Sequence, residues 1–227
     1  AYVPVAHDYE GAPVQLDIHL VLDKLRGLLE DPRRTVIGQN LKYDISVLAK
    51  YGVQVKARIF DTMLESYVLN SVASRHNMDD LALKYLGEMT VHFEDIAGKG
   101  AKQLTFNQIE LEKAGHYAAE DADITYRLHE TLYPKLKEEP SLASVFTDIE
   151  IPLVGILSRV ERTGVLIDEA QLSSQSKELE KRMAEFQQEA YGLAGEEFNL
   201  NSPKQLSEVL FVKLKLPVIK KTKTGYS

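Results

Sequence analysis

The chain contains no cysteine among its 227 residues, which excludes disulfide bonds and thiolate-bound metal sites. It also lacks a continuous run of about 18 apolar residues, and this argues against a membrane span. The N-terminus does not show the charged and then apolar pattern of a secretory signal, so a cytoplasmic location is expected. The remaining composition, 44% hydrophobic and 27% charged residues, is typical of a globular protein that buries a core.

Basic residues are in the minority, because 27 Lys and Arg stand against 34 Asp and Glu and give a net charge of -7. Residues 1–150 carry 16 basic and 24 acidic side chains, whereas residues 151–227 carry 11 and 10. An acidic first part can still meet phosphate groups if its carboxylates hold metal ions. Residues 211–227 contain five Lys and no acid, which indicates either a solvated loop or a segment that contacts phosphate.

Hydrophobic periodicity predicts alternating strands and helices in the first part of the chain. Residues 1–7 read as a short strand, with Pro4 favouring an edge or terminal position. Further along, we expect a helix over 16–30, a strand over 35–38, a helix over 41–50, a strand at 59–60 and a helix over 61–69. This alternation indicates an α/β domain in which helices cover a sheet.

The rest of the chain has helical periodicity only. Helices are expected over 77–86, 107–138, 142–162 and 171–193, and a last one follows Asn201-Ser202-Pro203 and reaches Phe211. Pro140 is the expected boundary between a first domain, residues 1–140, and a second, all-helical domain, residues 141–227. The helix over 171–193 is expected to present one narrow apolar stripe made of Leu172, Leu179, Met183, Phe186 and Ala190.

Two pairs of polar residues have the same spacing. Asn40 and Asp44 are four residues apart where the strand over 35–38 turns into a helix. Tyr117 and Asp121 are four residues apart within a strongly helical segment. Residues at this spacing are neighbours on one helix face, so the two pairs at structured corners predict one shared site.

The residue types of these pairs suit a hard cation. Magnesium takes oxygen ligands, and sites that cleave phosphate esters use Asp or Glu in preference to His or Cys. Asp44 and Asp121 meet that requirement. For either pair alone, a solvated surface charge or a packed tyrosine is the commoner explanation, so the argument depends on the order and separation of both pairs together.

In this order the pairs resemble the second and third motifs of the DnaQ-like 3′-5′ exonucleases, Asn-x-x-x-Asp and then Tyr-x-x-x-Asp. Longer stretches resemble the proofreading domain of bacterial family A (polymerase I-type) DNA polymerases: GQNLKYD at 38–44, FDTMLESY at 60–67, IAGKG at 96–100 and YAAEDAD at 117–123. The similarity continues into the start of the polymerase region through EIPL at 150–153, ERTGV at 161–165 and EFNL at 197–200. It covers nearly the whole chain.

The resemblance implies a ribonuclease H-like (DnaQ-like) α/β exonuclease domain with a mixed sheet and helices, followed by an all-α, thumb-like segment. It implies two-metal hydrolysis of a phosphodiester at a DNA 3′ end, in an enzyme of DNA replication and repair. Two Mg²⁺ or Mn²⁺ ions would be held by four carboxylates, of which Asp44 and Asp121 are two. Tyr117 would orient the attacking water. The remainder of a polymerase chain is the implied protein partner, and no membrane is involved.

The resemblance also implies DNA contacts. The amides of Gln39 and Asn40 suit the terminal nucleotide of a single-stranded 3′ end. Arg75 resembles an arginine that contacts phosphate of the frayed strand, although an ion pair with Asp79 is an equal alternative. The thumb-like segment would grip duplex DNA, and its basic residues are Lys220, Lys221 and Lys223.

The first exonuclease motif of the family, Asp-x-Glu, is not found in residues 1–37 in a strand-like context. Asp8 and Glu10 have the right spacing but lie in a turn-like stretch. We expect the motif upstream of Ala1, and polymerase sequence after Ser227. The chain is therefore expected to be a segment of a longer polymerase, with little or no nuclease activity alone.

Two other functions remain as alternatives. An RNA-trimming exonuclease of the same fold would share both pairs but should lack the polymerase-like continuation over residues 150–227. A non-catalytic relative would keep the domain as a structural support after losing its metal ligands. Retention of Asn40, Asp44, Tyr117 and Asp121 argues against the second alternative.

Overall fold

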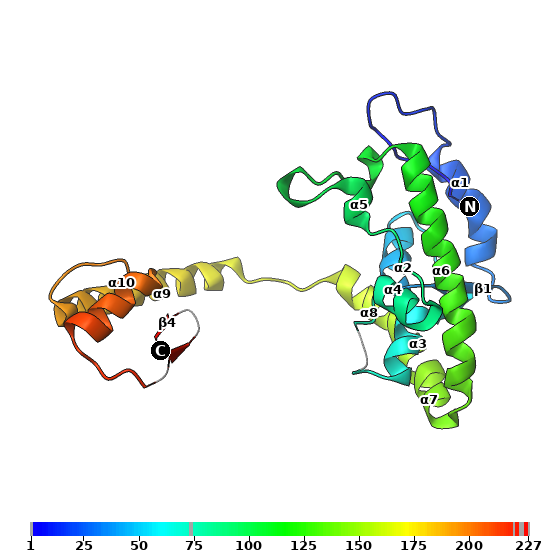
Figure 1. Cartoon of the computed structure of the whole chain (residues 1–227). Coiled ribbons are helices and arrows are strands. Elements are labelled where there is room, and N and C mark those ends of the chain that lie inside the picture. The colour runs from blue at the N-terminus through cyan, green and yellow to red at the C-terminus, as the bar shows by residue number, and fades with distance from the viewer. Residues whose placement is uncertain (1, 73–74, 220, 223–224, 227) are drawn as a thin grey trace. The chain divides into compact units, whose positions relative to one another are not determined.

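The computed structural model describes residues 2–72, 75–219, 221–222 and 225–226. Two compact units divide the chain, Ala1–Gly164 and Val165–Ser227. The division expected at Pro140 falls inside the first unit, because the helices that follow Pro140 pack against earlier helices of that unit (Figure 1).

The first unit is mostly helical. Its elements before Pro140 are α1 (Ile18–Leu29), β1 (Thr35–Gly38), α2 (Leu41–Lys50), β2 (Arg58–Asp61), α3 (Thr62–Leu69), α4 (Met78–Leu81), the π-helix η1 (Ala82–Leu86), α5 (Phe93–Ala97), the 3₁₀ turns η2 (Gly100–Lys102) and η3 (Phe106–Gln108), and α6 (Leu111–Lys137). The helices expected over 16–30, 41–50, 61–69 and 77–86 are confirmed, and the one expected over 107–138 begins four residues later.

The described sheet of this unit has two parallel strands, β1 and β2, with Thr35 opposite Arg58 and Gly38 opposite Asp61. The mixed sheet implied by the resemblance is not visible in this described part. The strand predicted over 1–7 is wrong for residues 2–7, which form no strand. Pro4 has no N–H to offer a ladder, and the backbone N–H and C=O of His7 are both bonded to the side chain of Gln15, at 2.8 and 2.7 Å.

The core of the first unit is built along α6, which is 27 residues long and extends along the unit (Figure 1). Leu128, Leu132 and Leu136 recur every four residues and are fully buried, which places them on one face of the helix. Leu128 and Leu132 pack in one cluster with residues of α4 and η1. Leu136 packs with Phe60 of β2 and Phe146, so α6 ties the strands to the flanking helices.

A buried acid also faces α6. Glu65 on α3 has no exposed surface, and its Oε1 lies 2.7 Å from Nδ1 of His129. Burial, with a smaller effect of the Asp61 charge, raises the pKa of Glu65 to about 9, and burial lowers the pKa of His129. At neutral pH the protonated carboxyl therefore donates to a neutral imidazole.

The segment after α6 completes the first unit with α7 (Pro140–Ser144), the π-helix η4 (Val145–Glu150) and α8 (Ile151–Thr163). Pro140 sits in the first turn of α7, where a missing N–H costs no hydrogen bond. On α8, the hydroxyl of Ser158 lies 2.9 Å from that of Ser46 on α2. By length and composition the run Pro140–Thr163 is apolar enough to cross a membrane, a property that core helices of soluble proteins share.

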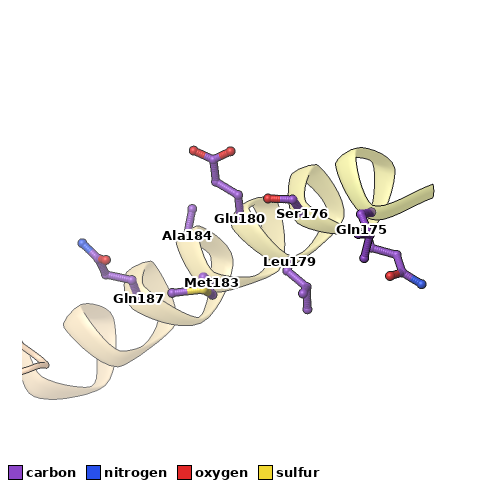
Figure 2. A pocket seen from close by; sticks show the side chains of 8 residues that line it. Gln175, Ser176, Leu179, Glu180, Met183, Ala184 and Gln187 are labelled. Atoms are coloured by element: carbon purple, nitrogen blue, oxygen red, sulfur yellow. The ribbon is translucent and has the colours of Figure 1, made fainter. Parts of the chain in front are cut away.

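The second unit begins with α9 (Glu169–Ala194), whose first turn is capped by Asp168, 2.9 Å from the N–H of Gln171. The stripe residues Leu179 and Met183 line a shallow groove on α9, with Glu180 projecting to a different side of the helix (Figure 2). After it come α10 (Pro203–Ser207), the π-helix η5 (Glu208–Lys213) and a short antiparallel pair, β3 (Lys221–Thr222) and β4 (Gly225–Tyr226). The helical expectations for this part are confirmed.

A sharp corner joins β1 to α2. Gly38 ends the strand, Asn40 has a left-handed backbone with φ of 58°, and Leu41 begins the helix. A Cβ added to Gly38 would lie 2.3 Å from Cδ2 and 2.6 Å from Cγ of Leu41, whose side chain is buried. Glycine is therefore required here by the close approach of Leu41.

Gly38→Ala is expected to lower the free energy of unfolding by about 1–3 kcal/mol, because the added methyl group overpacks the corner. Urea denaturation of the chain measures the change. Gly27→Ala is the matched control: Gly27 lies inside α1, where an added Cβ meets nothing within 4 Å, and alanine there should stabilise by up to about 1 kcal/mol. Equal effects of the two substitutions would contradict the close contact at Gly38.

Candidate active site

The β1–α2 corner carries the first predicted pair. Asn40 occupies the N-cap position of α2, and Asp44 lies in the first turn of that helix. The buried carboxylate of Asp61, at the end of β2, accepts the backbone N–H of Asn40 at 3.0 Å and that of Leu41 at 2.8 Å. The neighbouring strand therefore holds the corner from outside it.

Asp44 is exposed on α2, yet the protein around it withholds part of its hydration and raises its pKa. The charge of Asp61 raises this pKa further, while a backbone hydrogen bond lowers it. A carboxylate with a raised pKa is poorly stabilised by its own surroundings, so a cation placed beside it would stabilise the charged form.

The second predicted pair lies on α6, with Tyr117 and Asp121 both half-buried. Burial raises the pKa of Tyr117 to about 12, and the negative charge of Asp121 contributes. Burial raises the pKa of Asp121 to about 6; the charges of Glu120 and Asp79 add to this, and a hydrogen bond with Tyr117 opposes it. The phenol therefore stays protonated at neutral pH, while the carboxyl titrates close to it.

One oxygen of Asp121 has no protein partner. Its Oδ1 atom is buried and makes no hydrogen bond within the described part of the chain. Leaving a buried acceptor unpaired costs free energy, and a carboxylate oxygen is the kind of ligand that a hard cation prefers. The atom therefore fits a metal ligand better than a packed side chain.

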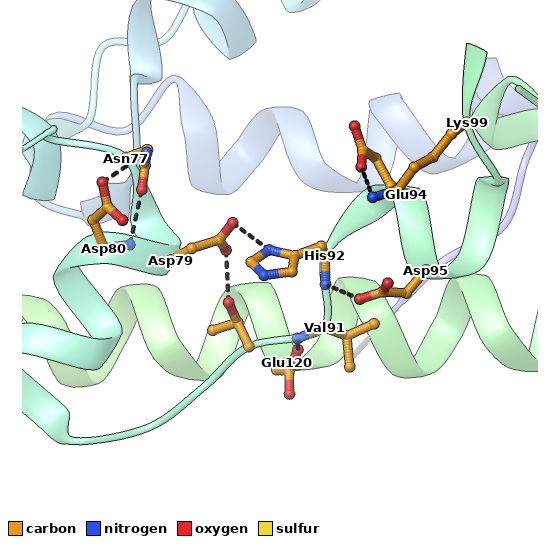
Figure 3. Close-up of polar contacts among 10 residues, drawn as sticks. Asn77, Asp79, Asp80, Val91, His92, Glu94, Asp95, Lys99 and Glu120 are labelled. Atoms are coloured by element: carbon orange, nitrogen blue, oxygen red, sulfur yellow. Dashed lines mark hydrogen bonds and ion pairs between the residues drawn. The ribbon is translucent and has the colours of Figure 1, made fainter.

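A loop between η1 and α5 is tied to the Tyr117 face of α6. The carboxylate of Asp79, on α4, faces the imidazole of His92 at 2.8 Å (Figure 3) and accepts the hydroxyl of Thr90 at 2.6 Å. The hydrogen bond to Asp79 raises the pKa of His92. On α6, Glu120 accepts the backbone N–H of Val91 at 2.8 Å. Asp79 and Glu120 thus combine a structural role with the negative field around Asp121.

Aromatic packing fixes the ring of Tyr117. The ring centroids of Phe93 and Phe106 each lie 6.2 Å from that of Tyr117, and the two phenylalanines stack on one another at 6.4 Å. Such contacts restrict the ring to one orientation, so the hydroxyl of Tyr117 is aimed by its neighbours.

A surface groove of about 560 Å³ lies beside the corner, lined by Gln39, Asn40, Met63, Arg75, His76, Asn77 and Met78. Arg75 is exposed on it. Its alternative partner, Asp79, bonds Thr90 and His92 instead. The amide of Gln39 donates to the backbone carbonyl of His76 at 2.8 Å, and its Oε1 accepts the hydroxyl of Thr62.

The groove links the neighbourhoods of the two pairs. Asn40 and Met78 both line it, and the sulfur of Met78 lies 3.5 Å from the hydroxyl of Thr125, one turn beyond Asp121 on α6. The charge that acts on Asp44 is that of Asp61, whereas those that act on Asp121 are Glu120 and Asp79. The shared cation pocket for Asp44 and Asp121 stays a prediction.

The described residues contain no group of three or more His, Cys, Asp or Glu side chains arranged to hold a metal ion. This agrees with the expectation that only two of four carboxylates lie in this chain. Of the predicted basic tip, Lys220 and Lys223 lie outside the described residues, and for Lys221 only its place in β3 is described.

Sequence reasoning missed Asp61, Asp79, Thr90 and Glu120 as residues that support the site. Asp61 lies in the quoted stretch at 60–67, directly after an apolar strand, and that position was the available signal. His92 was grouped with ordinary surface or core histidines, and its pairing with Asp79 spans 13 residues of chain. No local pattern indicates that contact.

Comparison with known proteins defines the class of this site. Residues 1–137 match the family model described as 3′-5′ exonuclease. The chain therefore belongs to the 3′-5′ exonuclease family of family A DNA polymerases, since residues 169–227 also match the model described as DNA polymerase family A.

Individual relatives agree with this membership. DNA polymerase I of Pseudomonas aeruginosa is 60% identical over 227 residues, covering 99% of this chain and 25% of the relative. DNA polymerase I of Rhizobium leguminosarum is 42% identical, covering 99% and 23%. A solved structure, the POL domain of Pol1 from M. smegmatis in complex with DNA primer-template and dNTP, matches with a TM-score of 0.70 and 27% identity, over 90% of this chain and 32% of that one. The chain thus spans about a quarter of the length of these curated relatives.

The Asp121 carboxyl is expected to titrate with a midpoint near pH 6 in the folded chain, because burial and the Glu120 charge raise its pKa to about 6. Carboxyl ¹³C NMR measures the midpoint. Glu120→Gln should lower it, whereas Asp123→Asn, an exposed position on the same helix, should leave it unchanged. A folded-state midpoint near the ordinary value of 3.8 would contradict the described environment.

The same pKa shift has a consequence for stability. Since the folded-state pKa of Asp121 lies above its ordinary value, protonation favours the fold. This contribution to the free energy of unfolding is complete below about pH 4 and is lost as the pH rises through 6. Relative to Asp121→Asn, the wild-type chain should therefore become less stable between these pH values.

Proposed function

We propose that this chain carries the 3′-5′ proofreading step of a DNA polymerase I-like enzyme, the hydrolysis of the terminal phosphodiester at a DNA 3′ end. The observation that carries the proposal is the unpaired, buried oxygen of Asp121 beside Tyr117, within the segment that matches the exonuclease model. The ribonuclease H-like fold of this unit is part of the proposal, as are the polymerising, replication and repair activities of a longer chain.

Asp44 and Asp121 would hold Mg²⁺ or Mn²⁺, because both offer carboxylate oxygens with raised pKa values and one of these oxygens lacks a partner. When bound, such ions activate water and stabilise the leaving 3′ oxygen. Two further carboxylates, outside this chain's described residues, would complete the set.

Tyr117 would hold and orient the attacking water. With a pKa of about 12, its hydroxyl is protonated at neutral pH and can both donate and accept a hydrogen bond. Phe93 and Phe106 keep the ring in place. Removal of the water's proton is then left to other groups, and the contribution of Tyr117 is positional.

The groove beside the corner would take the single-stranded 3′ end. Asn40 and Arg75 line it from opposite sides of the motif, one with an amide and the other with a guanidinium group. Gln39, proposed to act at the terminal nucleotide, bonds the carbonyl of His76, so it would act mainly by holding the segment next to Arg75. Arg75 would meet a phosphate.

The second unit would begin the polymerase thumb and contact duplex DNA, with Lys220, Lys221 and Lys223 as the proposed basic tip. The match of residues 169–227 to family A polymerases supports this. It also weighs against an RNA-trimming exonuclease, which would need no such segment. A location in the bacterial cytoplasm is proposed because the replicating DNA is there.

Asp121→Ala is expected to lower the rate of single-stranded DNA degradation roughly 100-fold or more, because it removes a proposed metal ligand. The assay uses a longer polymerase I-like chain that carries this sequence, with Mg²⁺ or Mn²⁺ present. The 227-residue chain alone should show little or no degradation, and EDTA should abolish the activity of the longer chain.

Asp123→Ala is the matched control, since Asp123 lies on the same helix, is exposed and pairs with Arg127 instead; it should keep wild-type activity. Unchanged degradation by Asp121→Ala would remove Asp121 from the site. Preference for RNA over DNA would favour the RNA-trimming alternative, and an inactive longer wild-type chain would favour the non-catalytic one.

A further inference from the structure

A buried carboxylate supports the site from the neighbouring strand. Asp61 is only 1% exposed, and both of its oxygens are used. Oδ1 accepts the backbone N–H groups of Asn40 and Met63, each at 3.0 Å, and Oδ2 accepts that of Leu41 at 2.8 Å. One side chain thus joins the starts of two helices, α2 and α3, at the ends of two paired strands.

The bond pattern at α2 is unusual for its sequence. Asparagine at an N-cap position normally accepts an N–H of the first turn with its own side chain, but Asn40 makes no such bond. Asp61 supplies acceptors to the corner in its place. The side-chain amide of Asn40 is thereby free of capping, and it lines the 560 Å³ groove.

The corner needs an external support. Asn40 is held at φ of 58°, a left-handed conformation that a residue other than glycine adopts at a cost. Its N–H is fixed by Asp61, and the hydroxyl of Thr62 donates to the carbonyl of Gly38 at 3.2 Å. The strand β2 therefore determines where α2 begins, and with it the position of Asp44 one turn later.

We infer that Asp61 is a positioning residue of the exonuclease site, which holds the amide of Asn40 and the carboxylate of Asp44 in their working places. It contacts neither DNA nor metal and acts through the backbone of the β1–α2 corner. The inference rests on the proposed function, because its effect on rate requires that Asn40 and Asp44 take part in the reaction.

Asp61→Asn tests this inference with two measurements. The new amide nitrogen cannot accept the N–H of Leu41, so hydrogen exchange at Leu41 in this chain should become at least about 10-fold faster. In the longer chain, kcat for single-stranded DNA should fall roughly 10- to 100-fold, because small misplacement of reacting groups is costly. KM should change less than about 3-fold, since Arg75 and the rest of the groove remain.

Asp17→Ala is the matched control. Asp17 accepts the N–H groups of His19 and Leu20 at 2.9 and 3.0 Å at the start of α1, so its loss removes comparable bonds away from the corner. It should lower thermal stability and leave kcat unchanged. If Asp61→Asn fails to fold, Thr62→Val loosens the same corner by removing the bond to Gly38, and a smaller loss of kcat with faster exchange at Leu41 is expected.

The outcomes separate the two proposals. Slow exchange at Leu41 in Asp61→Asn, or fast exchange with wild-type kcat, overturns the positioning role while the exonuclease assignment stands. A longer wild-type chain without nuclease activity overturns the proposed function, whereas the exchange measurement still reports whether Asp61 holds the corner. Equal losses of kcat in Asp61→Asn and Asp17→Ala would mean that stability alone is responsible.

Discussion

Three backbone N–H groups converge on the buried carboxylate of Asp61, and the arrangement of the candidate site depends on that interaction. The bonds keep Asn40 in a left-handed conformation and set the first turn of α2. Through Thr62 and Gln39 the same strand end is connected to the carbonyl of His76. The motif at residues 38–44 is therefore a folded corner whose geometry is determined by β2.

The site also concentrates carboxyl groups that their surroundings hold above their usual pKa. Burial acts on Asp44, Asp61, Glu65 and Asp121 alike. Glu65 is neutralised by its proton and bonded to His129, whereas Asp121 keeps an unpaired oxygen. Ionised groups in such positions reduce the stability of the fold, and perturbed groups of this kind gather at functional sites. A bound cation would reverse the cost at Asp121 and Asp44.

Local sequence predicted the elements well where a local signal existed. Leu41–Lys50 begins after Gly38-Gln39-Asn40 and ends next to Gly52, and α9 follows from its Asp168 cap and apolar stripe. The strand over 1–7 failed because its backbone bonds to Gln15 and to the 107–109 segment, partners that periodicity does not reveal. The pairs at 40/44 and 117/121 were visible through helical spacing, but the support from Asp61 and Asp79 was not, because it depends on tertiary contacts.

The most direct test of the account is the location of Mn²⁺ by anomalous scattering, in crystals of a longer polymerase I-like chain that carries this sequence. The account predicts an anomalous peak within roughly 2.5 Å of Oδ1 of Asp121, on the side that also faces the carboxylate of Asp44. Anomalous peaks elsewhere, with Oδ1 of Asp121 bonded to a protein group instead, would contradict the assignment of these residues to one metal-dependent nuclease site.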